Sequence, residues 1–146
     1  MSGELLKERR RFSEERLSLF RKRVAKIQEL SSQPELSIYV TGSYGRLEAH
    51  AGSDLDLFFV SGSAHPIERT AKILIDAALI RAAGELGFPP FSNDAQYLEI
   101  HDLGEMLCKL GGAEDDFKNF FTARMLSCWR VALYLGILLT GQFCEK

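Results

Sequence analysis

The sequence of 146 residues lacks any apolar run of the roughly 18 residues that a membrane-spanning helix needs. Its first residues are charged and amphipathic, unlike a secretory signal peptide. Cysteine is scarce, and the odd number without a C-x-x-C pair predicts neither a disulfide framework nor a zinc knuckle. We therefore expect a cytoplasmic protein without a membrane segment. The three cysteines are Cys108, Cys128 and Cys144.

The sequence also has no large excess of positive or negative charge. Of its residues, 26% are charged, and the net charge is −2. With 46% hydrophobic residues, the composition is that of one ordinary globular domain spanning residues 1–146. Residues 1–30 nevertheless carry nine Lys/Arg against five Asp/Glu. Such a helix could contact nucleic acid or an acidic partner, but a solvated helix face has the same pattern. We favour the solvated face.

Hydrophobic periodicity predicts helices that alternate with short strands. Leu17, Phe20 and Val24 recur every three or four residues, which is typical of an amphipathic helix. Residues 54–60 are apolar on both faces after an acidic start, as expected of a central strand. The predicted order begins with a basic helix about 5–30, followed by strands 37–40 and 54–60 and a helix from Pro66 to about Gly84 or Gly87. A strand 96–101, a short helix capped by Asp102 and a long helix about 115–139 complete it. The apolar face of the helix that begins at Pro66 is expected to contain Ile67, Ala71, Leu74, Ala78 and Ala82.

Two carboxylates open the second strand. On a strand, Asp54 and Asp56 would face the same side about 6.6 Å apart, and two such charges repel by roughly 2.5 kcal/mol at an effective dielectric constant of 20. Because the strand that follows is apolar, a bound cation is a better compensation than hydration. Oxygen ligands without nearby His or Cys favour Mg²⁺ or Mn²⁺, which proteins often bind together with substrate phosphates.

Gly42 and Ser43 follow the first strand. A glycine there lets backbone N–H groups approach an anion, and the turn after it offers further donors for phosphate. The P-loop spacing and the G-x-G-x-x-G spacing are both missing, which argues against a P-loop ATPase and a Rossmann dinucleotide site. Gly42 ends one strand and Asp54 begins the next, so the two motifs meet only if these strands are antiparallel. We predict that pairing.

These residues resemble the nucleotidyltransferase superfamily of the DNA polymerase β type, whose signature is Gly-Ser on a turn and D-x-D on the following strand. The string G-S-Y-G-R-L-E with S-D-L-D-L-F-F-V is most similar to the N-terminal domain of PII-uridylyltransferase-like proteins. The resemblance implies an α/β (α+β) fold with a small mixed sheet flanked by helices. It also implies two divalent ions, Mg²⁺ or Mn²⁺, and transfer of a nucleoside monophosphate from an NTP, such as ATP, to an acceptor with release of pyrophosphate.

The resemblance also assigns roles to residues. Asp54 and Asp56 are the expected metal ligands, and Glu99 is the candidate third carboxylate, with Asp94 as its rival. Gly42 and Ser43 are expected to bind phosphate, and Arg46 to neutralise its charge.

The acceptor stays open between a protein and a small molecule, as in antibiotic-modifying transferases. Two other functions also stay open: a nucleotide-binding regulatory module without turnover, and a docking protein that acts through the N-terminal helix. Related transferases continue into further domains, so the chain is compatible with being part of a longer protein.

Overall fold

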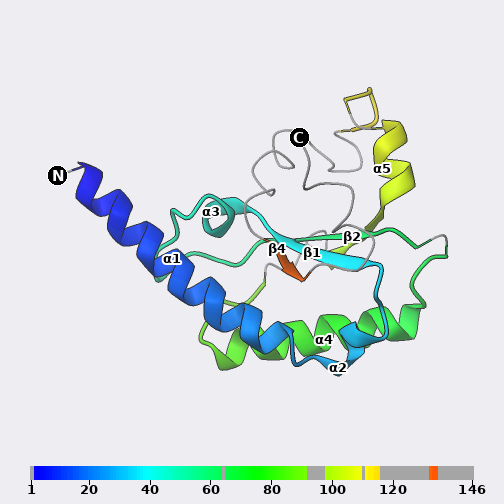
Figure 1. Cartoon of the computed structure of the whole chain (residues 1–146), viewed down its shortest axis with the longest axis horizontal. Helices are drawn as coiled ribbons and strands as arrows, with labels where there is room; N and C mark the ends of the chain where they lie inside the picture. The colour runs from blue at the N-terminus through cyan, green and yellow to red at the C-terminus, as the bar shows by residue number, and fades with distance from the viewer. Residues whose placement is uncertain (1, 64, 92–97, 110, 116–131, 135–146) are drawn as a thin grey trace.

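The computed structural model describes residues 2–63, 65–91, 98–109, 111–115 and 132–134. The strands form one four-stranded sheet in the order β3-β2-β1-β4 (Figure 1). In chain order the elements are α1 (Ser2–Val24), α2 (Gln28–Ser31), β1 (Leu36–Val40), α3 (Gly42–Gly45), β2 (Leu57–Ser61), α4 (Arg69–Glu85), β3 (Ile100–Asp102), α5 (Leu103–Lys109) and β4 (Ala132–Tyr134).

The two central strands pair antiparallel, as predicted. Val40 pairs with Leu57 at one end of the ladder, and Leu36 pairs with Ser61 at the other. β2 and β3 are parallel and are joined through α4, so the sheet is mixed. All five residues of β2 are buried, which confirms β2 as a central strand.

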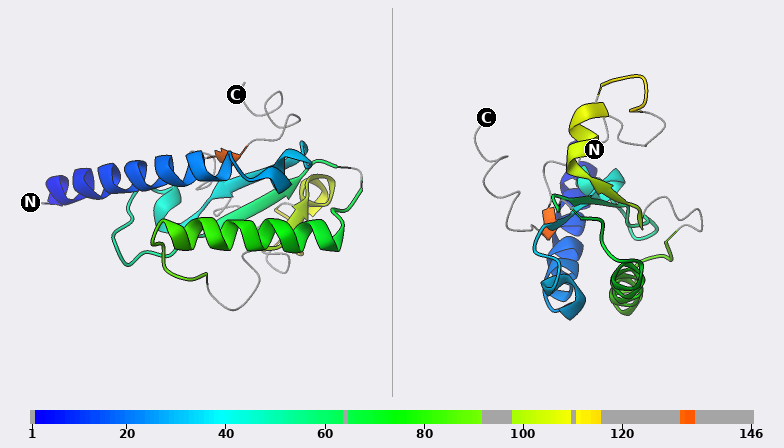
Figure 2. Two further views of the ribbon diagram at one scale, coloured as in Figure 1. Left: turned by 90° about the horizontal axis from the view of Figure 1, so that it is seen from below. Right: turned by 90° about the vertical axis from the view of Figure 1, so that its right-hand side faces the viewer.

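The helices divide between the two faces of the sheet. α1, α2 and α4 lie on one side and α5 lies on the other (Figure 2). The main core lies under the first group, where Phe20, Ile38 and Phe59 are fully buried. On the opposite face, a smaller cluster joins Phe58 and Val60 of β2 to Met106 of α5.

Most predicted helices are present with shifted boundaries. The predicted helix 5–30 is divided, because α1 ends at Val24 and α2 begins at Gln28. α4 begins at Arg69 rather than at Pro66, and its buried face contains Ile75 and Leu79 together with the predicted Ala78 and Ala82. The prediction was wrong for Leu74, which is 50% exposed. α4 carries large apolar residues on both faces, so periodicity alone could not orient it.

The C-terminal prediction was wrong where the structure describes it. Ala132–Tyr134 form β4, which pairs antiparallel with β1, whereas the sequence predicted a helix over 115–139. Short apolar runs fit a strand and a buried helix equally well, and the free edge of β1 offers hydrogen bonds that periodicity does not show. Residues 116–131 and 135–139 of that prediction lie outside the described residues.

The strand predicted over 96–101 is also displaced. β3 begins at Ile100 and ends at Asp102, and residues 96 and 97 are not among those described.

The short helix that follows is confirmed as α5. Lys109 of this helix donates hydrogen bonds to the carboxylates of Glu105 and Glu114, which raise the pKa of the lysine.

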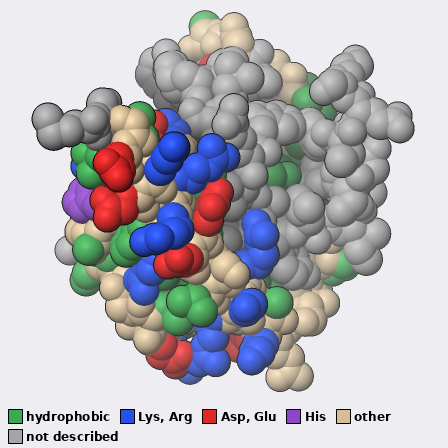
Figure 3. Space-filling view, turned by 60° about the vertical axis from the view of Figure 1, so that its left-hand side comes forward, with side chains coloured by type: hydrophobic (Ala, Val, Ile, Leu, Met, Phe, Trp, Pro, Cys, Tyr) green, Lys and Arg blue, Asp and Glu red, His purple; other side chains and the backbone are tan. Residues whose placement is uncertain are grey.

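The surface of α1 carries charges of both signs. Figure 3 shows Lys/Arg and Asp/Glu side chains interspersed over the face that it presents. Arg10 pairs with Glu14 and Arg11 with Glu15, one helical turn apart. Such exposed pairs are typical of a solvated helix. Among the described helices, none is long and apolar enough to cross a membrane.

Replacing Asp102 should destabilise the fold through the loss of a helix cap. The Oδ1 atom of Asp102 accepts a 2.7 Å hydrogen bond from the backbone N–H of Glu105, as the sequence predicted. We expect Asp102→Ala to lower the free energy of unfolding by about 1 kcal/mol in denaturant titrations. Glu68 is the matched control, because it occupies the N-cap of α4 without a capping hydrogen bond. Equal losses in Asp102→Ala and Glu68→Ala would contradict a capping role.

Candidate active site

The Gly-Ser turn and the acidic pair meet at one end of the β1–β2 ladder. The backbone N–H of Thr41 donates a 2.9 Å hydrogen bond to the carbonyl of Asp56, which extends the ladder one residue beyond Val40 and Leu57. Gly42 follows at once and begins α3. The pairing therefore places the start of α3 beside the acidic residues.

Gly42 is required at this point for two reasons. Its φ angle is +61°, in the left-handed region that favours glycine. A Cβ atom on Gly42 would lie only 1.9 Å from Oδ2 of Asp56. The carboxylate of Asp56 thus packs directly against the α-carbon of Gly42, and no side chain could be inserted between them.

The acidic residues alternate with buried leucines. Leu55 and Leu57 are 3% and 2% exposed, whereas Asp54 is exposed and Asp56 is half-buried. This alternation of exposed and buried residues is the pattern of an extended segment whose successive side chains point to opposite sides. Both carboxylates precede β2 rather than lying within it, and their orientation toward the same side stays a prediction.

An aromatic cluster fixes α3 to the core. Tyr44 in α3 is 1% exposed and packs edge-to-face on Phe88, with ring centroids 5.4 Å apart. Phe88 packs in the same way on Phe20 of α1, at 5.5 Å. The turn that carries Gly42 and Ser43 is therefore held by a buried side chain, and Gly42 at its start lies against Asp56.

Arg46 lies at the end of α3, where its Nε atom donates a 3.0 Å hydrogen bond to Oε2 of Glu48. Both side chains are about half exposed, at 52% and 48%. Exposed ion pairs contribute little to stability, so Arg46 could exchange Glu48 for a phosphate group at little cost.

The third predicted carboxylate is not gathered with the first two. Glu99 is exposed and immediately precedes β3, where it lines a surface hollow together with His65 and Lys72. Asp94 lies outside the described residues. Within the described part of the chain, no group of three or more Asp, Glu, His or Cys side chains is placed to hold a metal ion. The role of Glu99 stays a prediction.

The sequence profile of the nucleotidyltransferase domain matches residues 17–127, which include α3, β2, α4 and β3. The chain belongs to the nucleotidyltransferase domain family. Membership implies transfer of a nucleoside monophosphate from an NTP. Neither a curated protein nor a solved structure matches the chain.

The acidic pair of this nucleotidyltransferase domain fits a magnesium ion. Asp54 and Asp56 offer hard carboxylate oxygens, and Gly42 leaves space for one of them. Magnesium commonly binds one or two protein carboxylates and completes its coordination with water and substrate phosphates. Two carboxylates are therefore a sufficient set of protein ligands for one ion.

Reasoning from the sequence missed the residues that hold the nucleotidyltransferase site in shape. Tyr44 lies inside the motif, yet its anchoring role depends on Phe88, more than forty positions away. Ser13 is fully buried on α1 and accepts a 3.0 Å hydrogen bond from the N–H of Ala49. The one available signal was that Ser13 extends the apolar stripe of Leu17 and Phe20 by one helical turn.

Replacing Gly42 by alanine should disrupt the contact with Asp56 beyond the cost of backbone strain alone. Gly111 is the matched control, because its φ angle is +75° but a Cβ there would meet no atom within 4 Å. We expect Gly111→Ala to cost about 1–2 kcal/mol of unfolding free energy. Gly42→Ala should cost more and should abolish nucleotidyl transfer. Equal stability losses, with transfer retained in both variants, would show that the close contact is unimportant.

Proposed function

We propose that the chain is a Mg²⁺-dependent nucleotidyltransferase whose site is formed by Gly42, Ser43, Asp54 and Asp56. The observation that carries this proposal is the packing of the Asp56 carboxylate against Gly42, at the end of an antiparallel strand pair. That contact brings an anion-binding turn next to two carboxylates. This combination is expected where a cation and a polyphosphate bind between them.

The triphosphate would bind at the start of α3. The first N–H groups of a helical turn have no acceptor within the helix and can donate to phosphate oxygens. Ser43 is half-buried at this position and adds a hydroxyl donor. Arg46 lies one turn further on and would neutralise phosphate charge after leaving Glu48.

Asp54 and Asp56 would hold the magnesium. The ion, when bound, neutralises charge on the phosphates and stabilises the pyrophosphate leaving group. An oxygen of the acceptor attacks the α-phosphorus, the bond to the bridging oxygen of the β-phosphate breaks, and pyrophosphate leaves. The proton of the acceptor hydroxyl needs a base, and Glu99 is our candidate. A second metal ion would require Glu99, or Asp94, to approach the aspartates.

The proposal covers an acceptor that is either a protein or a small molecule. The narrower resemblances, to PII-uridylyltransferases and to antibiotic-modifying enzymes, remain predictions, as does a cytoplasmic location. A second function is favoured by one observation: among the described residues, no third carboxylate joins Asp54 and Asp56. A domain with only this pair could bind a nucleotide and a metal without turnover.

Removing the acidic pair should abolish transfer without unfolding the domain. We expect Asp54→Asn with Asp56→Asn to reduce the incorporation of label from ³²P-labelled NTPs into candidate acceptors by at least about 10³-fold, because neutral amides hold Mg²⁺ poorly. Glu68→Gln, an exposed carboxylate ahead of α4, is the control and should retain full activity. Transfer that survives the double substitution would refute the proposed mechanism.

Glu99→Gln separates the two candidate functions. If Glu99 is the base or third ligand, we expect transfer to fall about 10²- to 10⁴-fold, while Mg²⁺-dependent NTP binding measured by calorimetry changes little. If the domain is a binding module, the wild type should bind Mg-NTP without any transfer, and Glu99→Gln should bind equally well. Full transfer activity in Glu99→Gln would exclude the residue from catalysis.

A further inference from the structure

We propose that Ser13 and Arg16, in the part of α1 that precedes the matched family region, are positioning residues for the active site. This inference rests on the proposed function. The family match begins at residue 17, so both residues lie just outside it. Ser13 contacts the loop that precedes Asp54, and Arg16 contacts Phe88, which packs on Tyr44 of α3.

Ser13 holds the loop that leads to the acidic pair. Its side chain is fully buried in the middle of a helix. The hydroxyl donates a 2.7 Å hydrogen bond to the carbonyl of Arg9 and accepts a 3.0 Å hydrogen bond from the N–H of Ala49. Ala49 is also fully buried and lies five residues before Asp54. A buried N–H needs an acceptor, and Ser13 supplies it from outside the loop.

Arg16 acts on the phosphate-binding turn through an aromatic ring. Its guanidinium carbon lies 4.1 Å from the centroid of the Phe88 ring, and Nη1 donates a 2.7 Å hydrogen bond to the carbonyl of Leu86. Phe88 packs on Tyr44, the buried anchor of α3. Within the described residues Arg16 makes no ion pair, so the ring and the carbonyl are its main stabilising contacts.

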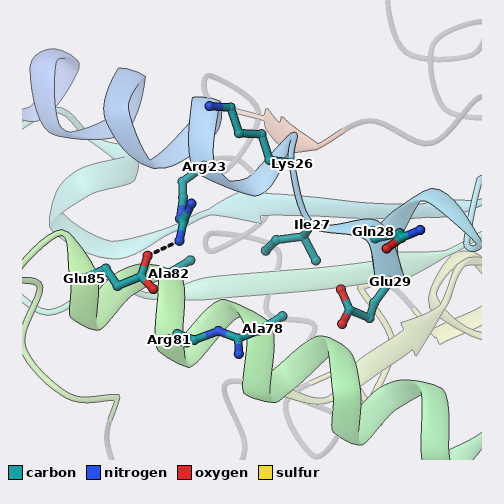
Figure 4. Close-up of a pocket in the computed structure, with 9 residues that line it drawn as sticks. All are labelled: Arg23, Lys26, Ile27, Gln28, Glu29, Ala78, Arg81, Ala82 and Glu85. Atoms are coloured by element: carbon teal, nitrogen blue, oxygen red, sulfur yellow. Dashed lines mark hydrogen bonds and ion pairs between the residues drawn. The ribbon is translucent and has the colours of Figure 1, made fainter.

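The two residues form one support because they are three positions apart and therefore lie on the same face of α1. The helix is itself fixed to the rest of the fold. Leu17 and Phe20 are buried in the core, and Arg23 pairs with Glu85 of α4 across the cleft between these helices (Figure 4). One turn of a well-anchored helix thus holds the loop before Asp54 and the turn of Gly42.

This support matters because the site is assembled from two segments that the sequence separates by a loop. The contact of Asp56 with Gly42 leaves no spare room, and small displacements of positioned groups lower catalytic rates strongly. Within the loop, Ser53 and His50 exchange hydrogen bonds with each other, and Nδ1 of His50 accepts one from the N–H of Gly52. Ser13 supplies the hydrogen bond that ties this loop to α1.

The first test is hydrogen exchange of backbone amides in the full chain. We expect Ser13→Ala to accelerate exchange at Ala49 by about tenfold or more, because that amide loses its acceptor. Leu17→Ala is the matched control, since it removes a buried side chain one turn along α1 but leaves the hydrogen bond between Ser13 and Ala49 in place. It should destabilise the whole domain but leave exchange at Ala49 within what the lower global stability explains. Equal acceleration in the two variants would overturn the proposal.

The second test is the affinity for Mn²⁺ alone, measured by electron paramagnetic resonance. A merely structural role would make Ser13→Ala and Leu17→Ala equivalent among folded molecules. We expect Ser13→Ala to weaken Mn²⁺ binding about tenfold, because Asp54 and Asp56 lose their fixed orientation, and Leu17→Ala to leave it unchanged. Equal affinities in both variants would overturn the positioning role. A wild type that binds no Mn²⁺ would count against the proposed function. Amide exchange at Ala49 would still test whether Ser13 holds the loop.

Arg16 requires its own comparison. We expect Arg16→Gln to accelerate exchange at the amides of Gly45 and Arg46, which close α3, about tenfold, and to leave Ala49 unaffected. Arg16→Lys should behave like Arg16→Gln if the planar guanidinium on Phe88 is what matters. Unchanged exchange in α3 in both variants would remove Arg16 from the proposal.

Discussion

The hydrogen bond from the N–H of Thr41 to the carbonyl of Asp56 fixes the point at which the two halves of the site meet. It continues the β1–β2 ladder by one residue and sets Gly42 beside the acidic side chain. Had the strands slipped by one residue, every side chain of β2 would change face, and Asp56 would point into the core. The burial of Leu55, Leu57 and Phe59 opposes that slip, so hydrophobic packing determines the geometry of a polar site.

The chemistry of the site and its support come from different parts of the chain. Asp54 and Asp56 occupy the positions that the leucines leave, where two like charges are tolerated only with hydration or a cation. The elements that hold them are apolar: Tyr44 and Phe88 under α3, and the buried turn of α1. This division explains why α1 influences the site although it contributes no expected catalytic group.

The predictions from the sequence were most accurate for the two strands next to the proposed site. The antiparallel pairing followed from the requirement that Gly42 and Asp54 share one end of the sheet, and β1 and β2 were also clear from composition. The predictions for Leu74 and for a helix over 115–139 were wrong for a common reason. Where a segment has apolar residues on every side, its orientation is determined by contacts that are distant in sequence. The ties from Ser13 to Ala49 and from Tyr44 to Phe88 are of that kind, so only coordinates could show them.

The geometry of the sheet determines how far Glu99, the predicted third carboxylate, lies from Asp56. β3 runs parallel to β2 with Ile100 beside Phe59, and an ideal extension of this register by one residue would put Glu99 beside Phe58. Phe58 and Asp56 are two residues apart and share a face. One strand spacing combined with two residues along the strand gives about 8 Å between the α-carbons of Glu99 and Asp56. A glutamate side chain can bridge most of that distance. A shared ion therefore requires Glu99 to turn from the hollow beside His65 toward Asp56, a change of side-chain direction rather than of fold.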